Sequence, residues 1–412
     1  DSLLGVESLP GFAEGDTLSF RAVITDLAGN ATTGSPSGVT LLGDQNAPTV
    51  TSIDTTTPDG SYNAPDPIVV RVNFGESVTL AGGTLDATLD TADVVAIAAF
   101  GPAASASGTY TIGAGDTSAN LTVTLLALDA ATLRDAAGND ADLSLPVGNN
   151  LADNAAIVVD TTAPAGFMAG AVTTTGGTVV ANYWNSTNAG VTVTIPIASD
   201  ASLAGGTAQL QGSRDGSTWE NLSAATAIVA VNTTMDLSDS LLGVESLPGF
   251  AEGDTLSFRA VITDLAGNAT TGAASGVTLL VDQSAPTLNS IAIVSDNPDA
   301  PPLYNAKILD TITLSFTASE PLIGLPTVTV TSLARDATEI GLGGNDYEAT
   351  YQLLPDDRTI AEAPIVFTID YTDAAGNVGA QETATDDASV VTFYRELTWG
   401  GSAGGAWHTA GN

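Results

Sequence analysis

A five-residue motif, Asp-x-Ala-Gly-Asn, occurs four times in this sequence and offers oxygen atoms that could bind a cation. Its acid and amide pairs are Asp26 and Asn30, Asp135 and Asn139, Asp264 and Asn268, and Asp373 and Asn377. Asp and Asn are also common in plain turns, because their side chains hydrogen-bond their own backbone, and the Gly suits a positive φ angle. One copy would therefore predict only a turn. The recurrence of the motif, together with acidic linkers, favours a cation site.

Two further sets of acidic residues recur with the motif. The linker acids are Asp44, Asp160 and Asp282, each followed by two polar residues and an Ala-Pro pair, as in "DQNAP". The loop acids are Glu76, Asp200 and Glu320, each placed after an apolar run, as in "FTASEPL". For the loop acids a metal-binding role and a plain surface role stay equally open.

The chemistry of these groups predicts calcium (Ca2+). Carboxylates brought together without a counter-charge repel one another and raise one another's pKa. Calcium takes six to eight oxygen ligands from carboxylates, amides, backbone carbonyls and water, and it needs neither His nor Cys. Magnesium demands a tighter octahedral geometry. We therefore expect calcium at the places where the motif, the linker acid and the loop acid meet.

The apolar residues alternate with polar ones, which is the pattern of half-buried β-strands. Four segments show it most clearly: Ile68, Val70, Val72 and Phe74; Val191, Val193, Ile195 and Ile197; Ile312, Leu314 and Phe316; and Leu256, Phe258, Ala260 and Ile262. The same alternation runs through Ile365, Phe367, Ile369 and Tyr371. No helical period is sustained, so the predicted fold is all-β, a tandem array of Ig-like antiparallel β-sandwich domains.

That fold would bring the acids together. In an Ig-like sandwich the chain entry, the loop after the second strand and the loop after the sixth strand lie at one end. The linker acid, the loop acid and the Asp-x-Ala-Gly-Asn turn would then meet at each of three junctions.

An internal duplication and the linkers define the expected domains. Residues 1–49 and 239–287 differ at four positions, Ser35/Ala273, Pro36/Ala274, Gly43/Val281 and Asn46/Ser284. Residues 1–47 therefore correspond to the C-terminal half of a domain. The predicted Ig-like domains are 48–163, 164–285 and 286–394, and residues 395–412 would begin a further β-rich domain or tail.

Charge and residue counts exclude several classes of function. With 47 acidic and 9 basic residues, a net charge of -38 argues against a nucleic-acid partner. No run of about 18 apolar residues occurs, so no membrane insertion is expected. The chain has no Cys and a single His, His408, which argues against a thiolate site, a histidine metal site or a Ser-His-Asp triad. We predict that the protein is not an enzyme.

The segments "TDLAGNAT", "FTASEPL" and "VDTTAP" resemble the bacterial Ig-like (BIg-type) repeats of large extracellular adhesins and surface proteins. The resemblance covers about residues 1–394. It implies secretion or display at the cell surface, calcium at the domain junctions, and a stiff stalk that carries an adhesive tip. The domain at 48–163 departs from the pattern, because the insertion-like "LSLPVGNNLADNA" follows its turn.

Three hypotheses follow. The first is a non-catalytic, calcium-stiffened stalk for adhesion, whose partner would be a cell-surface or matrix ligand bound elsewhere in the full-length protein. The second is a subunit of an extracellular filament, sheath or surface layer, in which the protein binds itself by strand exchange between subunits. The third is that the acidity reflects life in brine without metal sites. Calcium binding separates the third from the first two.

Overall fold

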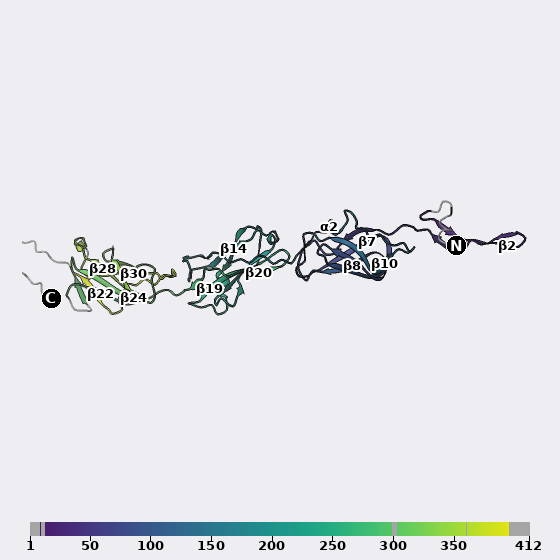
Figure 1. Ribbon diagram of the computed structural model, residues 1–412. Helices are drawn as coiled ribbons and strands as arrows, with labels where there is room; N and C mark the ends of the chain where they lie inside the picture. The colour runs from purple at the N-terminus through teal and green to yellow at the C-terminus, as the bar shows by residue number, and fades with distance from the viewer. Residues whose placement is uncertain (1–8, 10–12, 299–302, 360, 395–412) are drawn as a thin grey trace, which may run out of the picture. The chain divides into compact units, whose positions relative to one another are not determined.

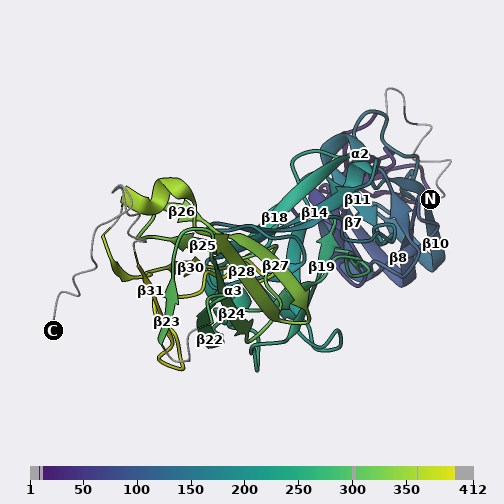
Figure 2. The same cartoon turned by 90° about the vertical axis from the view of Figure 1, so that its left-hand side faces the viewer.

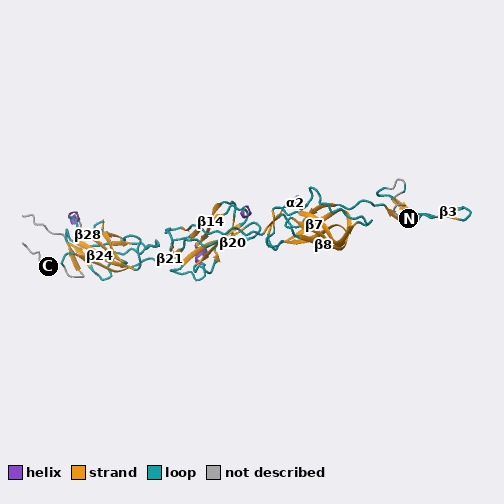
Figure 3. Cartoon of the chain, in the orientation of Figure 1, coloured by secondary structure: helices purple, strands orange, loops and turns teal. Residues whose placement is uncertain are grey.

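The computed structural model describes residues 9, 13–298, 303–359 and 361–394, and these consist mainly of short strands joined by turns (Figure 3). They divide into two compact units. The first holds residues up to 165 with 200–207 and 263–270, and the second holds 166–199, 208–262 and the residues from 271 onward. The predicted tail at 395–412 lies outside the described residues.

Residues 13–43 form two small antiparallel pairs, which we call the open half-sandwich. The strands are β1 (Thr17–Ser19), β2 (Val23–Thr25), β3 (Ala31–Thr33) and β4 (Thr40–Leu42). β1 pairs with β4 and β2 pairs with β3 (Figure 1).

The first complete sandwich, residues 50–160, has one large sheet and one small sheet. The large sheet has the order β10-β7-β5, with β8 also paired to β7, and the small sheet has the order β6-β11-β9. The strands are β5 (Val50–Asp54), β6 (Gly60–Tyr62), β7 (Pro67–Leu89), β8 (Val94–Thr111), β9 (Thr117–Ser118), β10 (Val123–Arg134) and β11 (Ile157–Asp160). The insertion-like segment forms a short helix, α2 (Leu151–Asn154), which Asn150 caps at its N-terminus.

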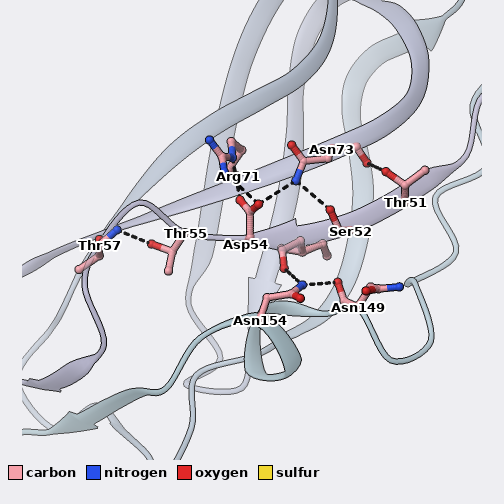
Figure 4. Close-up of polar contacts among 10 residues, drawn as sticks. Thr51, Ser52, Asp54, Thr55, Thr57, Arg71, Asn73, Asn149 and Asn154 are labelled. Carbon is pink, nitrogen blue, oxygen red and sulfur yellow. Dashed lines mark hydrogen bonds and ion pairs between the residues drawn. The ribbon is translucent and has the colours of Figure 1, made fainter.

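The alternation predicted for this sandwich is confirmed. Ile68, Val70 and Val72 on β7 are fully buried. Arg71 and Asn73 point to the other face of the sheet, where both contact Asp54 on β5 (Figure 4). The Arg71 guanidinium donates to both Asp54 oxygens at 2.7 and 2.9 Å. Polar side chains therefore bond to one another on the outer face, while the inner face forms the core.

The middle sandwich, residues 172–281, again has two sheets. One has the order β12-β14-β18, and β14 and β18 run side by side (Figure 2). The other contains the path β13-β21-β19-β15-β16. The strands are β12 (Val172–Thr175), β13 (Tyr183–Trp184), β14 (Gly190–Ile197), β15 (Thr207–Ser213), β16 (Glu220–Asn221), β17 (Thr226–Ala227), β18 (Thr233–Ser240), β19 (Thr255–Thr263), β20 (Ala269–Thr271) and β21 (Leu279–Val281). Two short helices, η1 (Ala201–Leu203) and α3 (Leu241–Glu245), complete it.

The last sandwich, residues 288–393, has a four-stranded sheet with the order β22-β24-β28-β27 and two three-stranded sheets, β23-β31-β29 and β26-β25-β30. The elements are β22 (Leu288–Ser295), β23 (Leu303–Ala306), β24 (Thr311–Ala318), β25 (Thr327–Val330), β26 (Arg335–Asp336), β27 (Thr338–Gly343), β28 (Asp346–Gln352), η2 (Pro355–Thr359), β29 (Ala363–Pro364), β30 (Thr368–Asp370) and β31 (Val390–Phe393). The residues predicted to face inward on β14, β19, β24 and around β30 are buried. The chain is therefore an all-β tandem of Ig-like sandwiches, as predicted.

Candidate metal centres

In each copy of the Asp-x-Ala-Gly-Asn turn, the Asp carboxylate accepts hydrogen bonds from the backbone N–H and the side-chain amide of the Asn four residues later. In the second copy, Asp135 Oδ1 accepts hydrogen bonds from the backbone N–H groups of Gly138 at 2.6 Å and Asn139 at 2.9 Å. The Asn139 side-chain amide donates to Asp135 Oδ2 at 2.8 Å. Gly138 has a φ of +99°, a left-handed conformation that a residue with a Cβ adopts only with strain. The sequence motif therefore encodes a specific turn, whatever else it binds.

The same asparagine also ties the turn to the preceding linker. Its side-chain N–H donates to the linker acid's backbone carbonyl in three copies, Asn139 to Asp44 at 3.2 Å, Asn268 to Asp160 at 2.8 Å and Asn377 to Asp282 at 2.9 Å. The Asn377 amide oxygen accepts from the backbone N–H and the hydroxyl of Ser186. The geometry thus gives these asparagines a positioning role, and their role as direct ligands stays a prediction.

At two junctions the turn, the linker and the loop acid come together. Asp44, Glu76 and Asp135 form one group, the Glu76 cluster, and Asp282, Glu320 and Asp373 form the other, the Glu320 cluster. In each cluster one carboxylate oxygen per residue lies within 4.8 Å of the others. Asp135 and Asp373 are buried, while the other members are partly exposed.

The clusters occupy the ends of strands with one exception. Asp282 follows β21, Glu320 follows β24, and Asp373 follows β30. Glu76, which we expected in a loop, lies inside β7, because that strand continues to Leu89. The register with β8 shifts between Asn73 and Val78, so Glu76 sits in an irregular stretch of the strand. Such a bulge re-aims side chains that a regular strand would hold in strict alternation.

A fourth acid, which we did not predict from the sequence, accompanies each cluster. Glu14 accepts from the backbone N–H of Gln45 at 2.7 Å, and Glu252 accepts from that of Gln283 at 2.9 Å. The charge of Glu14 acts on Glu76, and the charge of Glu252 acts on Asp282 and Glu320. The sequence did contain a signal for this acid, the segment "AEGD" that occurs in both repeats. In both copies its Glu accepts a hydrogen bond from the residue that follows the linker acid.

The electrostatics of the Glu320 cluster oppose ionisation. Burial raises the pKa of Asp282 to about 6, and the charges of Asp373 and Glu252 add to that rise. Burial also raises the pKa of Glu320, with further rises from the charges of Asp282, Asp373 and Glu252. The pKa of Glu76 is raised by burial and by the charges of Asp44, Asp135 and Glu14. In contrast, although burial acts in the opposite direction, hydrogen bonds from Asn139 and the turn backbone keep the pKa of Asp135 below its usual value.

The middle junction differs from the other two. Asp160 and the Asp264 turn are joined through Asn268, but Asp200 uses its carboxylate elsewhere, accepting from the Ser202 N–H at 2.9 Å and hydroxyl at 2.8 Å. Asp200 thereby caps the short helix η1. Among the residues that the structure describes, Asp160, Asp200 and Asp264 do not form a group like the two clusters.

The fourth acid is also replaced at this junction. The turn at Gly113–Asp116 has the same hydrogen bond as that at Ala251–Asp254, from the backbone N–H of its first residue to the carboxylate of its last, at 2.6 and 2.8 Å. Matching the two turns sets Ala114 at the position of Glu252. The middle junction therefore offers fewer carboxylates to a cation than either cluster.

Asp26 and Asn30 form the turn of the open half-sandwich. Asp26 accepts from the backbone N–H of Asn30 at 2.8 Å and from its side-chain amide at 2.9 Å. Neither residue belongs to an acidic group within the described part of the chain. Their proposed role as ligands stays a prediction.

We expect the contribution of Asp282 to the stability of the metal-free protein to fall as the pH rises from about 4 to above 6. Because the folded-state pKa of Asp282, about 6, exceeds the usual value of about 3.9, the folded state holds this proton more tightly than the unfolded state. The loss is complete once the pH exceeds the folded pKa. Asp282 is partly exposed, so solvent screening reduces its share to the order of 1 kcal/mol.

Urea unfolding in chelator at pH 4.5 and 7.5 would measure this effect. Asp282→Asn is expected to flatten the pH dependence, whereas Glu220→Gln, a change at an exposed site in the middle sandwich, is expected to leave it intact. An equal dependence in Asp282→Asn and in the parent chain would contradict the predicted role of Asp282.

The middle junction gives a gain-of-function prediction. Ala114 is exposed, so Ala114→Glu should fold and add a carboxylate where the other junctions carry one. Since calcium affinity follows the number of ligand charges, we expect it to rise about tenfold at this junction. Calcium titration of the variant would show the gain, and Ala114→Gln serves as its neutral control. Equal calcium affinities for Ala114→Glu and Ala114→Gln would contradict the placing of residue 114 at a metal-binding position.

The comparisons with known proteins concern the fold. No protein-family model matches the chain, and no curated protein sequence matches it. Three solved structures with similarity to it are the I9–I11 tandem from titin, fibronectin(III)-like modules of CbhA from Clostridium thermocellum, and a complex of Dpr2 Ig1–Ig2 with DIP-Theta Ig1–Ig3. Their sequence identities are 10%, 10% and 8%, and their TM-scores are 0.24, 0.23 and 0.20. The matches cover 83%, 56% and 84% of this chain and 98%, 90% and 100% of the others.

No helix within the described ranges has the length and apolar character needed to cross a membrane.

Proposed function

We propose that this chain is a non-catalytic structural segment of a large secreted or cell-surface protein, in which calcium at the domain junctions stiffens a stalk for adhesion. The observation that carries the proposal is the meeting of acids from successive repeats at one linker. Glu252 and Asp282 come from the middle sandwich and its linker, and Glu320 and Asp373 come from the last sandwich.

The donor set fits calcium. Each cluster offers only carboxylate oxygens within 4.8 Å of one another, the ligand type that calcium prefers. The charges that act on Glu320 are all negative, so a bound cation would remove repulsion as well as form bonds. Asp44, Glu76, Asp135 and Glu14 would hold one ion, and Asp282, Glu320, Asp373 and Glu252 another.

The mechanism is mechanical. At each cluster, acids before the linker and acids after it would bind one ion, so the linker could not bend without breaking bonds to the metal. In chelator the same acids repel, and the hydrogen bond from the Asn377 side chain to the Asp282 carbonyl is a direct tie between turn and linker. Extracellular modules bind calcium with dissociation constants of about 10⁻⁴ to 10⁻³ M, and we expect these sites to fall in that range.

Calorimetric calcium titration of the full chain tests the proposal. We expect two sites of similar affinity and a weaker response from the middle junction. The double variant Glu76→Gln and Glu320→Gln should lose both sites, whereas Glu220→Gln should keep them. Binding unaffected by the double variant would place calcium elsewhere, and no binding at all would sink the calcium mechanism.

Small-angle scattering tests the stiffening separately. In calcium the distribution of particle lengths should narrow and shift to larger values, and the double variant should show no such change. Saturable binding without any change in the scattering profile would leave calcium as a stabiliser of single domains rather than of junctions.

A further inference from the structure

A loop of the middle sandwich, residues 178–188, contacts the Asp-x-Ala-Gly-Asn turn of the last sandwich, and we call it the docking loop. The side-chain amide of Asn185 donates to the Ala375 carbonyl at 2.7 Å. Ser186 donates to the side-chain oxygen of Asn377 from its backbone N–H at 3.1 Å and from its hydroxyl at 2.7 Å. The loop and the turn belong to the same compact unit. Three hydrogen bonds therefore join two successive sandwiches, and none of them uses a carboxylate.

The contact between the docking loop and the turn is buried. Asn185, Ala375 and Asn377 are 0%, 0% and 1% exposed. Burying an amide is costly unless its donors and acceptors are paired. Asn185 donates its other amide hydrogen to the Thr178 carbonyl at 2.8 Å, and its oxygen accepts from the N–H and hydroxyl of Thr187. The loop therefore fixes the Asn185 side chain by itself and leaves one amide hydrogen for the turn.

The glycine of the turn fits the docking loop by its shape. Gly376 is buried, and a Cβ added there would lie 2.9 Å from Thr178 Cγ2 and 3.0 Å from Val180 Cγ2. In the preceding copy of the turn, Gly267 is exposed, and the nearest neighbour of an added Cβ would be Asn63 Nδ2 at 3.4 Å. Both glycines have a positive φ, +92° at Gly376 and +100° at Gly267. The turn conformation thus favours glycine in both copies, and the docking loop adds a packing reason at Gly376.

The first sandwich has an equivalent loop that lacks the serine. Asn63 and Asn185 each follow the strand that pairs in parallel with the last strand of the sandwich, and each backbone N–H donates to the side chain three residues later. The next residue is Ser186 in the docking loop and Ala64, which has no hydroxyl, in the first sandwich. Asn63 donates to Asn268 of the turn that it faces at 3.4 Å. Among the described residues, this loop makes one long hydrogen bond to its turn, whereas the docking loop makes three.

We propose that residues 178–188 are a docking surface for the Asp-x-Ala-Gly-Asn turn of the following repeat, and that this contact keeps the middle and last sandwiches docked when no metal is bound. The partner that fits is a turn with a glycine to lie against the loop, a carbonyl to accept from Asn185 and an asparagine oxygen to accept from Ser186. Asn377 also donates to the Asp282 carbonyl at 2.9 Å, so one amide joins the docking loop, the turn and the linker. The proposal does not rest on the calcium sites.

The docking contact acts against a repulsion. Asp373, which belongs to the same turn, places a carboxylate oxygen within 4.8 Å of those of Asp282 and Glu320. In chelator these carboxylates repel one another and push the turn away from the linker. The hydrogen bonds between the docking loop and the turn oppose that push. We therefore expect the two sandwiches to stay docked in chelator.

A matched pair of glycine variants of the full chain, both in chelator, tests the contact. Gly376→Ala and Gly267→Ala impose similar backbone strain, but only Gly376→Ala puts a methyl group against the docking loop. We expect amide hydrogen exchange in residues 183–188 to become about tenfold faster in Gly376→Ala. Exchange in residues 60–66 should change less than about twofold in Gly267→Ala. Exchange in β24 reports whether the last sandwich stays folded, and equal changes in the two variants with β24 protected would overturn the proposal.

Spin labels measure the docking directly. The chain has no Cys, so Glu220→Cys and Thr338→Cys, both at exposed positions, would label one site in each of the two sandwiches. In chelator we expect a narrow distribution of label-to-label distances, and one about twice as wide or more in Gly376→Ala. Ser186→Ala, which cannot disturb the fold of the last sandwich, should give an intermediate width, and Ser107→Ala, at an exposed site of the first sandwich, should give the parent width. A broad distribution in the parent chain, or the parent width in both Gly376→Ala and Ser186→Ala, would overturn the proposal.

Discussion

Phe258→Ala is expected to lower the free energy of unfolding of the middle sandwich by about 3 to 5 kcal/mol. Phe258 is fully buried, so removing its ring loses the transfer free energy of the side chain and leaves a cavity. Phe20→Ala, the same change at the equivalent position of the duplication, is expected to cost less than about 0.5 kcal/mol. Phe20 is 43% exposed, and its removal leaves no cavity. One substitution should therefore have two different effects within one chain.

Urea unfolding followed by hydrogen exchange would measure the two effects in the same molecule. Exchange of peptides from 255–263 reports the middle sandwich, and exchange of peptides from 17–25 reports the open half-sandwich. Similar costs for Phe20→Ala and Phe258→Ala in the unmodified chain would show that the open half-sandwich is already covered in solution.

The strands could be predicted because the alternation of apolar and polar residues lies within each strand. On β7 the alternation of Ile68, Val70 and Val72 with Arg71 and Asn73 can only place the apolar residues on one face of an extended chain. The same local rule sufficed for β14, β19 and β24. It could not predict that β7 continues past Glu76, because a bulge depends on pairing with β8 rather than on the residues of β7 alone.

The candidate sites depended more on tertiary structure. The Asp-x-Ala-Gly-Asn turn was visible because its hydrogen bonds join residues four apart. Glu14 and Glu252 were missed because their proximity to the clusters arises from the pairing of distant strands, β1 with β4 and β19 with β21.

Asp200 shows how a local competitor decides the position of a side chain. Two residues after it stands Ser202, whose N–H and hydroxyl both donate to its carboxylate. An Asp followed by such donors is a typical N-cap, and that pattern was legible in the sequence. Glu320 is followed by Pro321, which has no N–H to donate, and its carboxylate lies with Asp282 and Asp373. Asp200 and Glu320 occupy equivalent positions, and their carboxylates lie in different places because the residues that follow them differ.

The effect of Glu320→Gln on the free energy of unfolding is expected to change sign when calcium is added. In chelator it should stabilise the folded protein by about 0.5 to 1 kcal/mol, after allowance for solvent screening. The reason is that the pKa of Glu320 is raised by burial and by negative neighbours, so its ionised form destabilises the folded state at neutral pH. Glutamine has the same shape without the charge. It should relieve that repulsion while leaving the packing unchanged.

In calcium at about a hundredfold excess over the dissociation constant, the parent chain should gain about 2.7 kcal/mol at each site. Loss of the site in Glu320→Gln would forfeit that gain, and even a tenfold loss of affinity would forfeit about 1.4 kcal/mol, which exceeds the advantage of the variant in chelator. The order of stability of the two proteins should therefore reverse. Urea unfolding of both, with and without calcium, measures the reversal, and Glu220→Gln controls for the loss of one negative charge. If the acidic surface binds no metal, and serves only in brine or for solubility, the order of stability of the parent chain and Glu320→Gln would be the same with and without calcium. Only a cation held by Glu320 itself converts a repulsive carboxylate into a stabilising one.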